Sequence, residues 1–436
     1  MDVYSEEEEY MLRQGSGSNR RSVVNRQSIA AVNRASVSGS SPQQAEPSRT
    51  ERAKVRAHKS RKKAPELTER EQYDPTYSLG ALPAYRSGRD QDVHEDRIQT
   101  LMKAGFTRGL SRCLLGTTEA FALRIWVVDN SGSMTERDGN RVVPQGQSIV
   151  SVPCSRWEEI CDTVQYHANM AATLNSPTIF RLLNDPGSRI GPQQFGIAEE
   201  GEEYINDDLR LMRSVMNKAQ PGGVTPLTKH ILEIQQGLHQ LAPQLVSEGK
   251  RAVVILATDG LPTDEEGYGG PEITNEFMAA LKSLEGLPVW VVIRLCTDEP
   301  MVTEFYNNLD DKLELSLEVL DDYAGEAHEI HVHNRWLNYG LPLHRLRELG
   351  FHDRVMDMID ERPLTKGEIA IFCSVLFGAN DLPDPAADWV GFVKALDKVM
   401  KTERKQWSPV KNKVIPWIDL KKLHQDHGDG SKCVIM

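Results

Sequence analysis

Three oxygen-bearing side chains alternate directly after a short apolar stretch of the sequence. Asp129, Ser131 and Ser133 form the pattern Asp-x-Ser-x-Ser and follow residues 122–128, an apolar run typical of a buried parallel strand. At a strand end, one carboxylate and two hydroxyls can converge on one point, and they are the hard ligands that Mg²⁺, Mn²⁺ and Ca²⁺ prefer. The same residues could instead begin a helix, with Ser133 as its N-cap. The pattern alone therefore leaves a cation site and a helix N-terminus as alternatives.

Two further residues favour the cation site. Asp259 follows Thr258 and the apolar residues 252–257, which places a second carboxylate at the carboxyl end of another predicted strand. Thr225 lies in a Gly-Gly-Val-Thr-Pro loop ahead of a predicted helix and adds a third hydroxyl. Because open α/β sheets bind ligands at the carboxyl ends of their strands, we expect all three segments at one edge of a sheet.

The surrounding sequence alternates between predicted strands and predicted helices. The strands are expected at residues 122–128, 179–183, 252–257, 289–295 and 317–320, and the helices between them at 157–174, 202–219, 226–246 and 274–284. Such alternation predicts an α/β fold with a doubly wound, mostly parallel sheet. After about residue 334 the strand signals stop and short helical patterns follow, which predicts a small α-helical C-terminal module.

We therefore divide the chain into five segments. They are a Ser/Arg-rich N-terminal region predicted to be disordered, a helical lead-in, the α/β domain, the helical module and a basic tail, at residues 1–92, 93–117, 118–335, 336–406 and 407–436. The N-terminal region is poor in aromatic residues, so it cannot bury enough apolar surface to offset its chain entropy.

Together, the five oxygen-bearing residues resemble the metal-ion-dependent adhesion site of the von Willebrand factor type A family. That site is written Asp-x-Ser-x-Ser, then a loop Thr, then a strand-end Asp, and Asp129, Ser131, Ser133, Thr225 and Asp259 match every position. The resemblance covers residues 118–335 and implies a Rossmann-like fold that supplies the ligands from three loops. The sequence departs from the family pattern at residues 134–156, where we expect an inserted hairpin near the site.

The predicted site would leave its cation incompletely coordinated. Two carboxylates balance the charge of a dication and three hydroxyls add none, so an octahedral ion would keep water or accept an outside ligand. An acidic side chain of a partner protein is the natural ligand for that position. We therefore expect a non-enzymatic interaction module with Mg²⁺ as the preferred ion and Mn²⁺ or Ca²⁺ as alternatives.

Two other functions remain open. The same crevice could serve a metal-dependent enzyme that handles phosphate compounds, although a phosphatase with Asp129 as its nucleophile would want a second Asp where the chain has Ser131. Alternatively, the protein could be a membrane scaffold whose metal site stays unoccupied. His331 and His333 alternate in an expected strand-like or loop stretch and could bind a transition metal, but surface histidines are the commoner explanation.

The last four residues suggest a lipid anchor. Cys433-Val-Ile-Met436 fits the C-a-a-X prenylation pattern, and a final Met favours a farnesyl group on Cys433. One lipid chain binds a membrane only marginally, so basic residues of the tail are expected to provide a second contact. The expected location is cytoplasmic, at the cytosolic face of a membrane.

A short repeat in the N-terminal region suggests regulation by phosphorylation. Asn-Arg-x-Ser-[Val/Ile] occurs three times, around Ser22, Ser28 and Ser36, in a stretch (residues 15–63) that carries twelve bases and two acids. Each phosphate would add about −1.5 to −2 charge, so the three serines could act as an electrostatic switch at an anionic membrane. Random drift in a low-complexity segment is the alternative.

Composition excludes several classes of protein. The net charge of −12 comes from an acidic body, whereas a nucleic-acid-binding domain would carry basic charge on its folded face, so no nucleic-acid partner is expected. The six cysteines include no Cys-x-x-Cys pair, which argues against a disulfide scaffold or a structural zinc site. The apolar runs fall short of the roughly 18 residues that a membrane-spanning helix needs.

Overall fold

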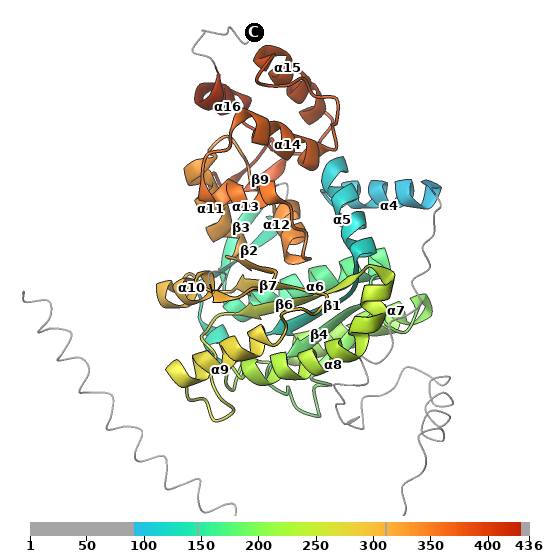
Figure 1. Ribbon diagram of the computed structural model, residues 1–436, viewed down its shortest axis with the longest axis vertical. Helices are drawn as coiled ribbons and strands as arrows, with labels where there is room; N and C mark the ends of the chain where they lie inside the picture. Colours follow the sequence, from blue (N-terminus) through green and yellow to red (C-terminus); the bar gives the residue numbers. More distant parts are fainter. Residues whose placement is uncertain (1–90, 146–147, 310–311, 429–436) are drawn as a thin grey trace, which may run out of the picture. The chain divides into compact units, whose positions relative to one another are not determined.

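The computed structural model describes residues 91–145, 148–309 and 312–428 (Figure 1). Ser22, Ser28 and Ser36 lie outside the described residues, as do Cys433 and nearly all of the N-terminal region predicted to be disordered. Among the described helices, none combines the length and the apolar character needed to cross a membrane.

A six-stranded sheet forms the centre of the α/β region. Its strand order is β5-β4-β1-β6-β7-β8, and all neighbours are parallel except β4 and β5. The strands are β1 (Phe121–Val128), β4 (Thr178–Leu182), β5 (Gln194–Ile197), β6 (Arg251–Thr258), β7 (Val289–Leu295) and β8 (Leu317–Leu320). The predicted mostly parallel sheet is confirmed, whereas β5, a short antiparallel strand at the edge, was not predicted.

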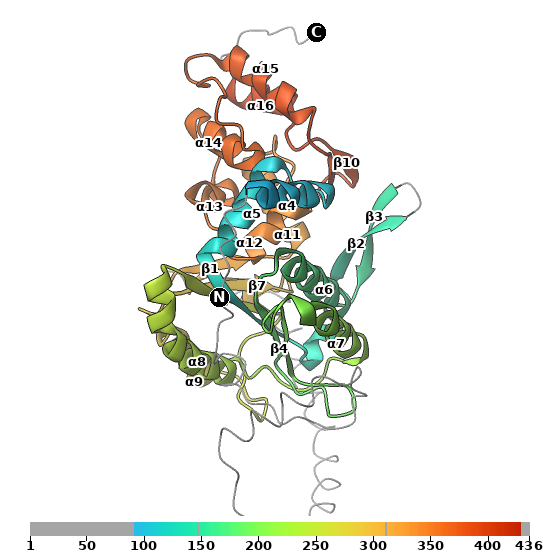
Figure 2. The same cartoon turned by 90° about the vertical axis from the view of Figure 1, so that its right-hand side faces the viewer.

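Helices cover both faces of this sheet, as Figure 2 shows. They are α6 (Arg156–Leu174) and α7 (Ile205–Lys218) on one face, and α8 (Leu227–Glu248), α9 (Pro271–Lys282) and α10 (Pro300–Asn307) on the other. Side chains of β1 alternate between the two layers: Trp126 and Val128 join the core under α6, and Ile125 and Val127 join the core under α8. Because β1 connects to β4 on one side and pairs with β6 on the other, the strand order reverses at β1, where such sheets place their ligand crevice.

The expected hairpin is present between β1 and α6. Strands β2 (Gly139–Gln145) and β3 (Ser148–Cys154) pair with each other in a separate antiparallel sheet and contact α6 and the later strand β10 (Lys413–Ile415) (Figure 2). A single 3-10 turn, η1 (Gly132–Thr135), precedes the hairpin. The alternative of a helix capped by Ser133 is wrong, because Ser133 lies inside this turn and no α-helix begins there.

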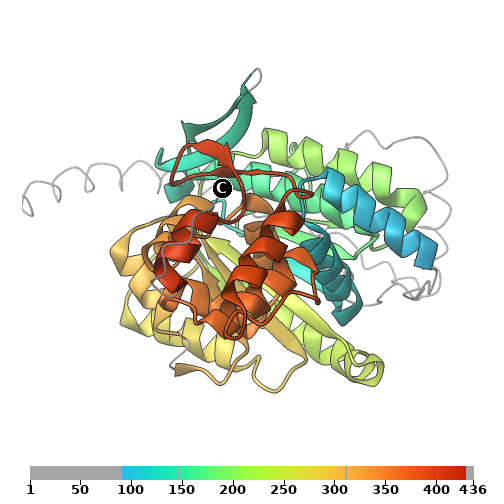
Figure 3. The same ribbon diagram turned by 90° about the horizontal axis from the view of Figure 1, so that it is seen from above.

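The remaining described helices share one apolar core. They are α4 (Gln91–Lys103) and α5 (Arg108–Ala120) before the sheet, and α11 (Tyr323–His333), α12 (Leu341–Glu348), α13 (Arg354–Glu361), α14 (Lys366–Phe377), α15 (Trp389–Met400) and α16 (Leu420–His427) after it. In Figure 3 the blue N-terminal helices lie beside the orange and red C-terminal ones, and α5 packs on α14. The lead-in and the helical module therefore bury their apolar faces against each other.

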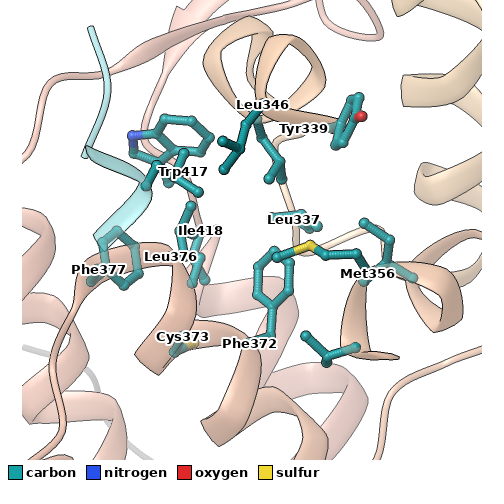
Figure 4. Packing of buried hydrophobic residues seen from close by; sticks show 14 of the residues in the cluster. Leu337, Tyr339, Leu346, Met356, Phe372, Cys373, Leu376, Phe377, Trp417 and Ile418 are labelled. Carbon is teal, nitrogen blue, oxygen red and sulfur yellow. The ribbon is translucent and has the colours of Figure 1, made fainter. Parts of the chain in front are cut away.

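Two local predictions after residue 320 are wrong. The basic tail does not begin at residue 407, because residues 406–428 form the strands β9 (Gln406–Ser408) and β10 and the helix α16. This segment buries Trp417 and Ile418 among side chains of α12, α13 and α14 (Figure 4). His331 and His333 lie in α11 rather than in a strand or loop. Residues two positions apart on an α-helix point in directions about 200° apart, so these two side chains do not converge on one ion.

The helical module attaches to the amino-terminal halves of the central strands. The Arg124 Nε of β1 donates to the Leu349 carbonyl at 3.3 Å, directly after α12. Gly350 has a φ of +87°, and a Cβ there would lie 3.0 Å from the Val253 side chain of β6. A glycine is needed because the loop approaches the strand closely in a left-handed conformation. The carboxyl ends of the strands lie at the opposite edge.

One buried arginine ties the sheet to three helices. Arg347 of α12 is 3% exposed, and its guanidinium donates to Glu318 of β8 at 2.9 Å and forms an ion pair with Glu326 of α11. A weaker contact of 3.5 Å reaches Asp360 of α13. Two buried carboxylates thus depend on a single cation, and its loss would leave both of them uncompensated.

We expect Arg347→Ala to lower the free energy of unfolding by about 3–5 kcal/mol, because it leaves the buried carboxylates of Glu318 and Glu326 without their cation. Chemical denaturation followed by circular dichroism measures this loss. Arg335→Ala is the matched control, since Arg335 pairs with Asp426 at the surface and such pairs contribute about 0–1 kcal/mol. Equal losses in the two variants would contradict the structural role assigned to Arg347.

Candidate metal centre

Backbone hydrogen bonds hold the loop after β1 against the loop that contains Gly222 and Gly223. Gly132 N donates to Gly223 O at 3.3 Å, and Gly222 N donates to Asn130 O at 2.7 Å. In addition, Asp129 N donates to Ala257 O at 2.9 Å, which continues the pairing of β1 with β6 beyond the strand. The loop after β1 is therefore fixed to the Gly-Gly loop on one side and to the end of β6 on the other.

A chain of hydrogen bonds joins Asp129 to Asp259. Ser131 N donates to Asp129 Oδ1 at 2.8 Å, the Ser131 and Ser133 hydroxyls lie 3.1 Å apart, and Ser133 Oγ donates to Asp259 Oδ1 at 2.9 Å. Asp129, Ser131 and Asp259 are buried, whereas Ser133 is exposed. These four residues, from positions up to 130 apart in the sequence, therefore form one cluster with Ser133 on its open side.

Thr225 lies in the Gly-Gly-Val-Thr-Pro loop, next to the segment that follows Asp259. Its backbone N donates to Thr263 Oγ1 and its carbonyl accepts from Thr263 N, both at 2.9 Å, so it is fixed to the segment that follows Asp259. A Cβ on Gly260 would lie 4.0 Å from Thr225 Oγ1. This hydroxyl has no hydrogen-bond partner within the described part of the chain and is free to bind a ligand. All five predicted residues thus lie at the carboxyl edge of the sheet.

Burial makes the two carboxylates unfavourable neighbours. Burial, together with the charge of Asp259, raises the pKa of Asp129 to about 6, although hydrogen bonds from Thr258 and Ser131 oppose the shift. The pKa of Asp259 is also raised, chiefly by burial, while a hydrogen bond from Arg156 acts in the opposite direction. A cation between the two would stabilise their charged forms, since an opposite charge within a few ångströms favours ionisation.

Two asparagines position the loops, and no pattern in the sequence indicated them. Asn184, just after β4, donates its Nδ2 to Val224 O at 2.8 Å and accepts from Val224 N at 3.3 Å. Asn130 in turn accepts from Asn184 N at 2.7 Å. Gly223 has a φ of +95°, and a Cβ there would lie 2.5 Å from Asn184 Oδ1, so only glycine fits. The Gly-Gly pair was visible in the sequence, but its partner asparagine was not.

Arg156 is the second feature that the sequence did not reveal. It is the first residue of α6, and its Nη1 donates to Asp259 Oδ2 at 2.9 Å. Its Nε donates to Asp138 Oδ1 at 2.8 Å, at the base of the hairpin. The hydrogen bonds that Arg156 donates, chiefly to Asp138 and then to Asp259, raise the pKa of Arg156 above its usual value. A permanent positive charge therefore lies beside one of the two candidate metal carboxylates.

The donor set fits a hard cation better than a softer ion such as Zn²⁺. In residues 91–145, 148–309 and 312–428, no group of three or more His, Cys, Asp or Glu side chains is placed to hold a metal ion. The centre offers two carboxylates and three hydroxyls, all oxygen donors, and one hydroxyl without a partner. Oxygen donors of this kind suit Mg²⁺, Mn²⁺ or Ca²⁺.

Searches of family models and of curated proteins return no match to this chain. The resemblance to the type A family therefore depends on the five residues.

We expect opposite effects of Asp129→Asn in the absence and presence of Mg²⁺. With chelator, the variant should melt at a higher temperature than the wild type at about pH 7, because the pKa of Asp129 is raised from 3.8 to about 6 and its ionised form is destabilising. This difference should shrink as the pH falls from about 6 and should be largely lost near pH 4. With Mg²⁺ at a hundred times its dissociation constant, the wild type should gain about 2.7 kcal/mol that the variant does not.

Differential scanning calorimetry with Mg²⁺ and with chelator measures both effects. Equal stabilisation of the two proteins by Mg²⁺ would show that the ion binds elsewhere.

Proposed function

We propose that this protein is a type A domain protein that binds Mg²⁺ through Asp129, Ser131, Ser133, Thr225 and Asp259 and uses the ion to capture an acidic group of a partner. The observation that carries the proposal is the gathering of these side chains from three loops, joined from Ser133 to Asp259 by a 2.9 Å hydrogen bond. The sheet, with β1 at the reversal of strand order, supports the same site.

The open side of the centre supports a role in recognition. Asp129 and Asp259 lie beneath the surface, and Ser133 is exposed above them. The buried carboxylates would balance the charge of an ion bound by all of these groups, and the ion would stay accessible to solvent on the side of Ser133. A carboxylate of a partner can take the remaining coordination position without displacing a protein ligand, because octahedral cations of this type retain exchangeable waters.

The environment of Asp129 favours binding over catalysis. A phosphatase of the type considered above needs an aspartate oxygen that can attack a phosphorus atom. Asp129 is fully buried, and its two oxygens accept hydrogen bonds from Ser131 N at 2.8 Å and from Thr258 Oγ1 at 2.7 Å. Both oxygens are oriented by the protein, so the carboxylate is suited to hold a cation rather than to act as a nucleophile.

The membrane part of the proposal rests on sequence alone. Farnesylation of Cys433 and regulation through Ser22, Ser28 and Ser36 stay predictions, since these residues lie outside the described part of the chain. If both hold, the metal centre would present its ligand site at the cytosolic face of a membrane.

We expect metal-dependent binding of acidic peptides. An array of peptides that contain Asp or Glu, each beside its Asn or Gln counterpart, would be probed with the full chain in Mg²⁺ and in chelator. Wild-type protein should bind a subset of acidic peptides at least about tenfold more tightly than their amide counterparts, a difference of about 1.4 kcal/mol, and only with Mg²⁺. Asp129→Ala should abolish this preference because it removes a carboxylate ligand.

Asp207→Ala is the matched control, because Asp207 is an exposed residue of α7 that pairs with Arg210. Its peptide binding should equal that of the wild type. Acidic peptides that bind equally well in chelator, or to Asp129→Ala, would contradict the proposed role of the ion. Turnover of a phosphomonoester panel in Mg²⁺ that is lost in Asp129→Ala would instead favour the enzyme.

A further inference from the structure

Arg156 is a buried charge that contacts the candidate metal centre. Its side chain is 3% exposed, and its Nη1 lies 2.9 Å from Asp259 Oδ2. The backbone N of Arg156 donates to Glu136 O at 3.0 Å, which anchors the start of α6 to the segment just after η1. The guanidinium is thus held beside Asp259 by the local fold as well as by its own hydrogen bonds.

The other edge of the guanidinium faces two carboxylates that do not belong to the metal centre. Asp138, at the base of the β2–β3 hairpin, accepts from Nε at 2.8 Å and also pairs with Nη2. Glu299, just before α10, lies 3.4 Å from Nη2. Both side chains are more than half exposed, at 53% and 62%. Of the three carboxylates around Arg156, only Asp259 is a candidate cation ligand.

A dication and this guanidinium would make conflicting demands on Asp259. Ser133 already occupies Oδ1 and Arg156 occupies Oδ2, so a cation that binds Asp259 must share an oxygen with one of these donors. Arg156 also holds a positive charge beside Asp259, so a dication bound by this carboxylate would lie close to a like charge. Like charges a few ångströms apart in a partly buried site repel strongly.

We propose that Arg156 competes with the cation for Asp259 and so lowers the affinity of the centre for its metal. The proposal rests on the cation site described under Proposed function and adds a residue that sets its affinity. Asp138 modulates the competition, because it holds the guanidinium from the side away from the metal and draws it off Asp259.

The opposite role is that of a positioning residue, in which Arg156 holds Asp259 in the geometry that the metal needs. Asp259 has other restraints, however: Ser133 Oγ bonds its Oδ1, and its backbone directly follows β6. The orientation of this carboxylate therefore survives the loss of Arg156, and the electrostatic effect dominates. The two roles predict opposite changes in metal affinity.

Isothermal titration of Mn²⁺ into the full chain distinguishes them. Arg156→Gln should bind Mn²⁺ about tenfold more tightly than the wild type, because one positive charge is removed from the site. Asp138→Asn should bind it several-fold more weakly, since the guanidinium then has one carboxylate fewer to hold it away from Asp259. Asp138 is at the surface, so this second variant remains informative if Arg156→Gln does not fold.

The matched control is Asp162→Asn. Asp162 is another acid, on α6, paired with an arginine, Arg141, that is not part of the metal centre. Its Mn²⁺ affinity should equal that of the wild type.

Each outcome decides the question. Equal or weaker Mn²⁺ binding by Arg156→Gln, or equal or tighter binding by Asp138→Asn, overturns the competition while the proposed cation site stands. Mn²⁺ binding by Arg156→Gln but not by the wild type would support the competition most strongly. If neither protein binds Mn²⁺, the proposed cation site fails and the competition fails with it.

Discussion

The mutual repulsion of two buried carboxylates is the constraint on which the structure of this centre depends. Asp129 and Asp259 follow adjacent parallel strands, β1 and β6, so the sheet itself fixes how close they are. Burial removes the water that would screen them and raises the pKa of both. These oxygens accept hydrogen bonds from four surrounding residues, which are Ser131, Ser133, Thr258 and Arg156. A cation would complete this compensation.

The rest of the fold keeps the carboxyl edge of the sheet available. The helical module packs on the amino-terminal halves of β1 and β6 through Arg124 and Gly350, and on β8 through Arg347. Near the centre, loops, the β2–β3 hairpin and the start of α6 surround the ligand-bearing residues, and Arg156 links that hairpin to Asp259 through Asp138. The element that the sequence showed as an insertion is therefore connected to the candidate site by a charge.

The sheet and the five oxygen-bearing residues of the candidate site could be picked out from the sequence because both depend on local signals. Buried parallel strands read as short apolar runs, and Asp129 and Asp259 each follow such a run directly. β5 was not predicted because a four-residue edge strand is too short to show a recognisable pattern of apolar residues. Residues 407–436 were expected to be a tail because their lysines suggest solvent, whereas Trp417 and Leu423 are buried in a core formed by residues far away in the sequence. Arg156 and Asn184 could not be found, since their role depends on contacts across loops that no local pattern encodes.

The central claim is that the five side chains bind one divalent cation. The most direct test is a crystal structure of the full chain soaked in Mn²⁺, with anomalous diffraction measured near the manganese edge. A single strong anomalous peak, within about 2.3 Å of oxygens of Asp129, Ser131 or Ser133 and absent in Asp129→Ala, is the predicted result. A wild-type map with no peak between Asp129 and Asp259, or with its only peak at another carboxylate cluster, would contradict the account.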